Sequence, residues 1–109
     1  MIRDLFLGFI KLHILHHAAE EPIFGLDMIR ELQRHGYDLS PGTLYPILRK
    51  LHEAGCLEQQ IEVVSGKQRK YYRATPAGEA ALAEAMVKVR ELVGEVGLDV
   101  PPIDQASGI

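Results

Sequence analysis

The stretch "LSPGTLYPILRKLHEAG", Leu39 to Gly55, decides how the rest of the chain is interpreted. Its apolar side chains recur every three or four residues, as on the buried face of a helix: Leu44, Ile47, Leu48, Leu51 and Ala54. Ser40 is a good N-cap because its hydroxyl can accept a hydrogen bond from an amide of the first turn. Pro41 fits the first helical position, and Gly55 can end the helix. The stretch therefore predicts a helix that begins after Ser40.

The opposite face of this helix has a composition that packing alone does not require. It carries Gly42, Tyr45, Pro46, Arg49, His52 and Glu53, with Thr43 and Lys50 on its flanks. Gly42 leaves the backbone unshielded, and Pro46 removes the amide that would bond to the Gly42 carbonyl. A recognition helix enters the major groove of DNA by its N-terminal end, which also carries a positive dipole. We therefore predict DNA contacts from Ser40, Gly42, Thr43, Tyr45, Pro46, Arg49 and Lys50. An ordinary capped helix with a solvated face is the alternative.

The flanking segments predict the remaining elements. Helices are expected at about 3–18 and 24–35, strands at 57–64 and 69–74, and a long helix from an N-cap at Thr75 to about residue 96. Residues 65–68 join the strands, and Gly66 supplies the turn. Alternation places Tyr71 and Tyr72 on opposite faces, so one of them is expected in the core. Two helices joined by a tight turn and followed by a hairpin predict a mainly α (α+β) winged helix-turn-helix.

Charge is distributed unevenly along the chain. The formal net charge of −3 argues against a generic binder of polyanions. Residues 64–76 nevertheless hold four cations and no acid, whereas six acids follow from Ala77 onward. Lys67, Arg69 and Lys70 lie at or near the tip of the predicted hairpin, where they can contact the phosphate backbone or the minor groove. We predict that these three bind DNA; a solvated hairpin is the alternative.

Length and composition limit the class of protein. The 109 residues fit one domain, and 47% apolar with 25% charged residues is ordinary for a globular protein. Charged residues interrupt the apolar residues 2–15, which are too short and too charged to span a bilayer. The single Cys56 cannot form an intramolecular disulfide, and no leader with a cleavage site precedes the first helix. We expect a soluble cytoplasmic protein that does not bind membranes.

Two helices present more apolar surface than a chain of this length can cover. The first is apolar over most of its circumference, at Leu5, Phe6, Phe9, Ile10, Leu12, Ile14 and Leu15. In the last, the apolar residues step by 4, 3, 4 and 3, as in a two-heptad seam: Leu82, Met86, Val89, Val93 and Val96. We predict a homodimer whose interface contains Leu5, Phe6, Phe9 and the five seam residues. Packing of the seam within its own subunit is the alternative.

No pattern of catalytic or metal-binding residues stands out. His13, His16 and His17 include a pair at i, i+4, the spacing of metal ligands, but no Glu follows as in zincins and no Cys is near. We interpret them as histidines at the edge of the helix and predict no metal and no cofactor. Cys56 lacks a base partner and is interpreted as a buried, inert thiol. Without a nucleophile–base pair, a phosphate-binding loop or paired carboxylates, we predict that the protein is not an enzyme.

Several separated blocks resemble the PadR family of bacterial and archaeal transcriptional regulators. Ser40 to Pro46 match the family's Ser-Pro-Gly-Thr-Leu-Tyr-Pro, Lys70 to Arg73 match Lys-Tyr-Tyr-Arg, and Thr75 with Gly78 matches Thr-x-x-Gly. The resemblance extends over about residues 5–92, and the single long C-terminal helix is similar to the smaller subfamily. It implies a winged helix-turn-helix DNA-binding domain at 1–75 and a C-terminal dimerisation helix at 76–96. Residues 97–109, with two prolines and two glycines, are expected to form a disordered tail.

Together these features predict a sequence-specific DNA-binding transcriptional regulator, and more narrowly a homodimeric repressor. Two-fold symmetry implies a pseudo-palindromic operator in double-stranded DNA. The sequence names no chemical class for a small-molecule effector. A winged-helix protein-interaction module without DNA binding is the alternative, and Arg49 and the cations of the hairpin count against it.

Overall fold

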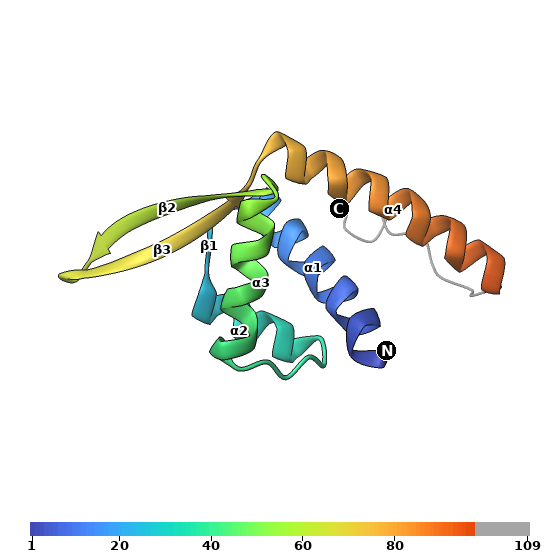
Figure 1. Cartoon of the computed structure of the whole chain (residues 1–109), viewed down its shortest axis with the longest axis horizontal. Helices are drawn as coiled ribbons and strands as arrows, with labels where there is room; N and C mark the ends of the chain where they lie inside the picture. The colour runs from blue at the N-terminus through green and yellow to red at the C-terminus, as the bar shows by residue number, and fades with distance from the viewer. Residues whose placement is uncertain (98–109) are drawn as a thin grey trace.

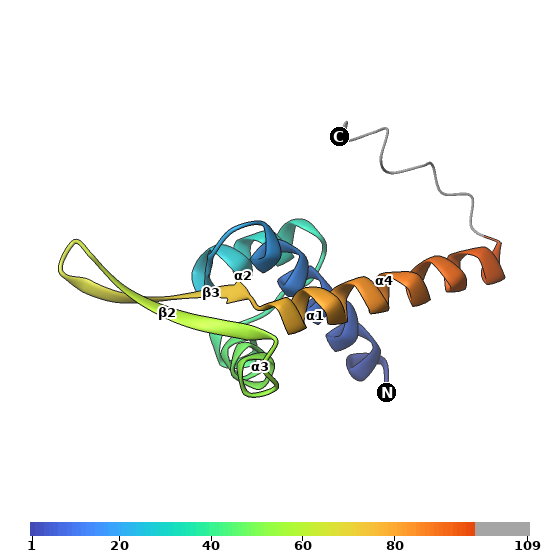
Figure 2. The ribbon, with the colours of Figure 1, turned by 90° about the horizontal axis from the view of Figure 1, so that it is seen from above.

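The computed structural model describes residues 1–97, and within them it contains four helices and three strands. In chain order these are α1 (Ile2–Glu20), β1 (Ile23–Phe24), α2 (Gly25–Arg34), α3 (Pro41–Glu53), β2 (Leu57–Val64), β3 (Lys67–Ala74) and α4 (Pro76–Val96). Helices α1 to α3 group together, the β2–β3 hairpin projects to one side, and α4 runs past α1 to the other (Figures 1 and 2). The expected mainly α winged helix-turn-helix is confirmed. Apart from Gly97, the expected tail at 97–109 lies outside the described residues.

The core lies where α1, α2 and α3 meet the base of the sheet. Its most completely buried large side chains are Ile14, Leu32, Leu44, Leu48 and Leu57. The predicted core face of α3 is confirmed for its four large apolar residues. Ala54 was expected on the same face and is exposed; it is the C-cap of α3, where its amide still donates to the Lys50 carbonyl at 2.9 Å.

The two predicted N-caps behave differently. Thr75 caps α4 as expected, since its Oγ1 accepts a hydrogen bond from the Gly78 amide at 3.0 Å. The side-chain cap predicted for Ser40 is wrong: its hydroxyl is directed to Thr43 Oγ1 at 3.4 Å and caps no amide. The Ser40 carbonyl still accepts from the amides of Thr43 and Leu44, each at 3.0 Å. The first turn of α3 is therefore held by the backbone of Ser40 alone.

The sheet is antiparallel, with the strand order β1-β3-β2. The predicted β2 is confirmed, but β3 begins at Lys67, and the expected four-residue loop is wrong. Lys67 pairs with Val64, so the turn consists of Ser65 and Gly66 alone, with φ of 52° and 78°. Two residues with positive φ match the right-handed twist of a hairpin, which is why the strands pair up to the turn.

Strand β1 was not predicted. Its two residues, Ile23 and Phe24, pair with Tyr72 and Tyr71 of β3. A strand of two residues is too short to show alternation, so the sequence carries no local signal for it. The expectation that one tyrosine of β3 is in the core is confirmed, because Tyr72 is buried and Tyr71 is half-buried.

The start of α4 is fixed to the end of α3. The Thr75 amide donates to the Cys56 carbonyl at 3.0 Å, and Thr75 Oγ1 donates to the Gly55 carbonyl. Gly78 packs so closely on Cys56 that a Cβ at position 78 would collide with the Cys56 carbonyl oxygen. The Cys56 side chain is half-buried, so the expectation of a buried thiol is wrong. These contacts set the direction of α4 relative to α3. Within residues 1–97, none of the helices combines the length and the apolar character needed to cross a membrane.

Candidate nucleic-acid interface

The N-terminal end of α3 is exposed and carries no acidic side chain in its first turn. Gly42, in this turn, is not required by packing, because an added Cβ would have only Ser40 Oγ nearby, at 3.7 Å. Pro46 lies inside the helix and supplies no amide to the Gly42 carbonyl. The result is an accessible backbone at the positive end of a helix dipole, a favourable place for a phosphate.

The larger side chains of this face have distinct surroundings. Arg49 and Lys50 are exposed, whereas Thr43 and Pro46 are half-buried. The Tyr45 ring lies against α2, where a Cβ on Gly25 would be 2.6 Å from the tyrosine oxygen. Tyr45 is nevertheless 37% exposed, so it is positioned by the protein and still reaches the surface. The predicted face thus combines one positioned aromatic ring with two exposed cations.

The fold adds a cation that sequence reasoning missed. A hollow of about 190 Å³ at the start of α3 is lined by Arg3 and Leu7 of α1 and by Gly42, Thr43, Pro46, Ile47 and Lys50 of α3. Arg3 and Lys50 therefore border the same hollow although 46 positions of the sequence separate them. No local pattern could have placed Arg3 here, because its position depends on how α1 packs against α3.

The hairpin presents its cations on both faces. Alternation along β3 puts Lys67 and Arg69 on one face and Lys70 on the other, and all three are exposed. Lys67 lies next to the turn, while Arg69 and Lys70 lie further along the strand. The guanidinium carbon of Arg69 is 4.8 Å from the centre of the Phe24 ring, a cation–π contact with β1. Arg69 is therefore held against an aromatic ring, whereas Lys67 and Lys70 are exposed on the two faces of the strand.

The residues predicted for dimerisation lie on two adjacent helices. On α1, Leu5, Phe6 and Phe9 are 59%, 47% and 39% exposed. On α4, Val96 is 57% exposed and the other four seam residues are half-buried. Between the helices runs a groove of about 330 Å³, lined by Phe9, Leu12, His13, His16, Leu82, Met86 and Val89. In both views α4 extends beyond α1, so among residues 1–97 no other element covers its C-terminal half (Figures 1 and 2).

His13 and His17 are not simply at the edge of α1, because both are half-buried near α2. Burial lowers the pKa of His13 and of His17, and the charges of neighbouring histidines lower both further, while Glu31 opposes the shift. The pKa of Glu31 is itself lowered: partial desolvation would raise it, but a hydrogen bond with His35 and the charge of Arg34 prevail. At neutral pH the side chains of His13 and His17 are therefore mainly neutral and lie near the ionised carboxylate of Glu31.

Known proteins similar to this chain agree with the arrangement. The model of the family described as "Transcriptional regulator PadR-like family" matches residues 14–84. The chain is 48% identical over 95 residues to Transcriptional regulator Rv3488 of Mycobacterium tuberculosis, covering 87% of this chain and 89% of the relative. It is 32% identical to the crystal structure of a PadR family transcriptional regulator from Eggerthella lenta, with a TM-score of 0.78 and coverages of 89% and 86%. For a PadR-like transcriptional regulator from Bacillus cereus the identity is 25%, the TM-score 0.72 and the coverages 89% and 99%.

Proposed function

Because the chain belongs to the PadR-like family of transcriptional regulators, which bind DNA and are not enzymes, we propose that it is a sequence-specific repressor that acts as a homodimer. The observation that carries the proposal is the start of α3, where an accessible first turn without an acidic side chain lies beside Tyr45, Arg49 and Lys50. A repressor needs only to occupy its operator. It acts where the chromosome is, which in a bacterium or archaeon is the cytoplasm.

The start of α3 is assigned to the major groove. Ser40, Gly42 and Thr43 bring the backbone and small polar side chains to the phosphates, and Arg49 is the residue that reaches a base edge. Tyr45 supplies a ring whose position is fixed by Gly25. Pro46 and Lys50 lie in the hollow shared with Arg3, which adds a phosphate contact from α1. Base readout thus comes from α3, with support from its neighbours.

The hairpin is assigned to the flanking backbone. Lys67 and Lys70, on opposite faces near the turn, can contact phosphates on both sides of a minor groove. Arg69 is restrained by Phe24 and contributes charge from a fixed place. These contacts carry little sequence information, since phosphates are the same along the duplex.

Dimerisation is assigned to α1 and α4, with residues 1–75 as the DNA-binding domain and 76–96 as the dimerisation helix. Phe9 of α1 lines one groove with Leu82, Met86 and Val89 of α4, so an apolar surface that spans both helices is available to a second copy. A two-fold axis there would present two α3 helices to half-sites of a pseudo-palindrome, about 34 Å apart. The α1–α4 groove is the place where a small-molecule effector would act, since a ligand there can alter the separation of the two DNA-binding units.

The proposal is tested by a gel shift with the protein's own promoter region against random DNA of equal length. With roughly 6–10 phosphate contacts per dimer, affinity should fall about 10³–10⁵-fold between 50 and 200 mM salt. Run-off transcription from the same promoter should decrease when the operator is occupied. Equal affinity for both DNAs, or binding that ignores salt over this range, would contradict the assignment of α3 and the hairpin.

A further inference from the structure

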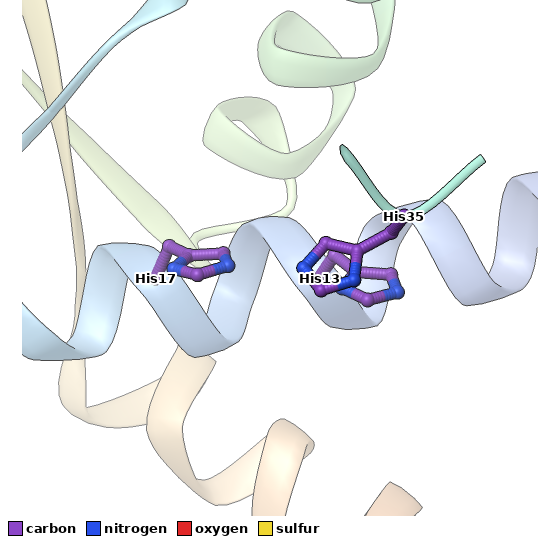
Figure 3. A group of neighbouring side chains, drawn as sticks. All are labelled: His13, His17 and His35. Atoms are coloured by element: carbon purple, nitrogen blue, oxygen red, sulfur yellow. The ribbon is translucent and has the colours of Figure 1, made fainter. Parts of the chain in front are cut away.

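Three histidines that are separated in sequence converge on one side of α1 (Figure 3). His13 and His17 are one turn apart on α1, and His35 follows the last residue of α2. One ring nitrogen from each lies within 4.8 Å of the others. The rings of His13 and His35 are stacked, with centres 4.6 Å apart. The packing of α2 on α1 thus adds a third imidazole to the i, i+4 pair.

A carboxylate accompanies the three rings. Glu31 Oε2 lies 3.1 Å from His35 Nε2 and 3.6 Å from His17 Nε2. Its other oxygen accepts from Arg34 Nη1 at 3.1 Å, which fixes the orientation of the carboxylate. The Glu31 side chain is only 24% exposed. A half-buried carboxylate that is directed at two imidazoles orients them and offsets positive charge between them.

We propose that His13, His17 and His35 bind a divalent transition-metal ion, with Zn²⁺ as the ion that this ligand set favours. Three neutral imidazole ligands with an open fourth position suit Zn²⁺ and its first-row neighbours, whereas Mg²⁺ and Ca²⁺ prefer oxygen ligands. Glu31 is a positioning residue that holds the rings of His35 and His17. An ion bound there would link α1 to the residue that follows α2. Helix α1 also carries the apolar face assigned to dimerisation.

The three histidine side chains must move slightly to reach the geometry of a bound Zn²⁺ ion. Two nitrogens each about 2.1 Å from a tetrahedral ion are about 3.4 Å apart, so the ligand atoms must move closer than they are here. His35 can provide this movement, because it lies beyond the last helical residue and its side chain is 44% exposed. A rotation of its ring out of the stack with His13 directs a nitrogen toward the other two.

A second group, His16, His17 and Glu20, is the competing arrangement. It lies on α1 alone, and the side chains of His16 and Glu20 are 56% and 62% exposed. An ion bound there would not join α1 to a second helix, and the only carboxylate of the group is that of Glu20. Because His17 belongs to both groups, His16 and His35 are the residues that distinguish them.

The test uses the full chain without an affinity tag. Co²⁺, followed by visible absorption, and Zn²⁺, followed by calorimetry, should each bind at one ion per chain, and Mg²⁺ should not compete. His35→Ala and His13→Ala should each weaken binding more than Glu31→Gln, for which we expect about a 10–100-fold loss. His16→Ala is the matched control on the same helix and should bind as the wild type does.

The proposal fails if His16→Ala loses the ion while His35→Ala keeps it, or if no variant changes the affinity. It also fails if the wild type shows no saturable binding. Nuclear magnetic resonance of the imidazole rings in the wild-type chain gives a readout that does not depend on any variant's folding. Zn²⁺ should shift the ring signals of His13, His17 and His35, and leave those of His16 and His52 in place.

Discussion

Gly78 lies where the first turn of α4 meets the backbone of Cys56, and a side chain cannot be accommodated there. At two other positions, a glycine serves a different purpose. Gly25 makes room for the Tyr45 ring, whereas Gly42 has open space around it. At the residue scale, a glycine is therefore needed at position 78 for close packing and at position 25 for the position of the Tyr45 ring. At position 42 the glycine leaves the backbone accessible.

We expect Gly78→Ala to destabilise the protein by about 1–3 kcal/mol, because overpacking against a backbone carbonyl forces the helix to shift. Gly94→Ala is the matched control on the same helix, since a Cβ there meets nothing within 4 Å. It should stabilise by about 0.5–1 kcal/mol, as Ala does relative to Gly inside a helix. Urea unfolding at a fixed protein concentration measures both. Equal stabilities of the two variants would show that the contact at Cys56 is not as close as described.

At the scale of elements, we propose separate tasks for α3 and the hairpin in DNA binding. The Tyr45 ring and Arg49 lie on a rigid helix, and the cations of the hairpin lie on a projecting two-stranded ribbon (Figure 1). A side chain on a rigid element can select one base edge, whereas charges on a projecting ribbon follow the phosphates of any sequence.

Replacing Lys67, Arg69 and Lys70 together with Ala should weaken binding to operator and random DNA about equally. The slope of affinity against salt should become shallower by about one for each phosphate contact that is lost. Arg49→Ala or Tyr45→Ala should instead reduce operator affinity more than random-DNA affinity, by about 1–3 kcal/mol for a base contact. Fluorescence anisotropy at several salt concentrations measures both effects.

The control for the charge change is Lys88→Ala, on the exposed surface of α4, which should leave both affinities unchanged. A hairpin variant that lost only the operator would contradict the division of tasks between the hairpin and α3.

The contact between α1 and α2 should respond to metal. If the three-histidine site exists, Zn²⁺ at one hundred times its Kd stabilises the folded chain by about 2.7 kcal/mol. For a domain of this size each kcal/mol raises Tm by about 4–8 °C, so scanning calorimetry with and without Zn²⁺ is sufficient. His35→Ala should unfold at the same temperature with and without Zn²⁺. An equal rise of Tm in wild type and variant would place the stabilising ion elsewhere.

At the scale of the whole molecule, the position of α4 would connect the proposed dimerisation to DNA binding. Its N-terminus is fixed to the end of α3 through Gly55 and Cys56, and its C-terminal half extends away from the body (Figure 2). A change in how two copies of α4 pack would therefore be transmitted to α3 as a change of spacing. This is the physical basis for expecting that a dimer is needed for operator binding.

Val89→Asp combined with Val93→Asp should disrupt the dimer, because both residues are half-buried on the seam and burying two carboxylates there is unfavourable. Light scattering should report monomer or aggregate, and operator binding should be lost although α3 is unchanged. Val87→Asp is the matched control: it is 60% exposed and lies on the opposite side of the helix, so dimer and operator binding should persist. A double variant that remained dimeric and bound its operator normally would overturn the assignment of the interface.

The sequence by itself determined the order of the helices and hairpin, their approximate bounds apart from the start of β3, and the four large buried residues of α3. These features follow from periodicity, caps and turn residues, which act between residues close in the chain. The block from Ser40 to Pro46 also identified the face assigned to DNA, because an unshielded backbone beside cations is visible in sequence alone. Two local predictions were wrong. The Ser40 hydroxyl is directed to the hydroxyl of Thr43 and caps no amide, and the hairpin closes with a two-residue turn in place of the expected loop at 65–68.

Only the tertiary structure decided which distant residues meet. It paired the two residues of β1 with β3, placed Arg3 beside Lys50, and brought His35 to the histidines of α1. Each of these juxtapositions depends on the angle and distance at which one element packs on another, and side-chain periodicity within an element does not specify either. The histidine pair on α1 was visible in the sequence, but the third ring and its carboxylate come from α2 and the residue that follows it. The physical reason is that packing of apolar faces holds these elements together, and the polar groups at their edges meet as a consequence.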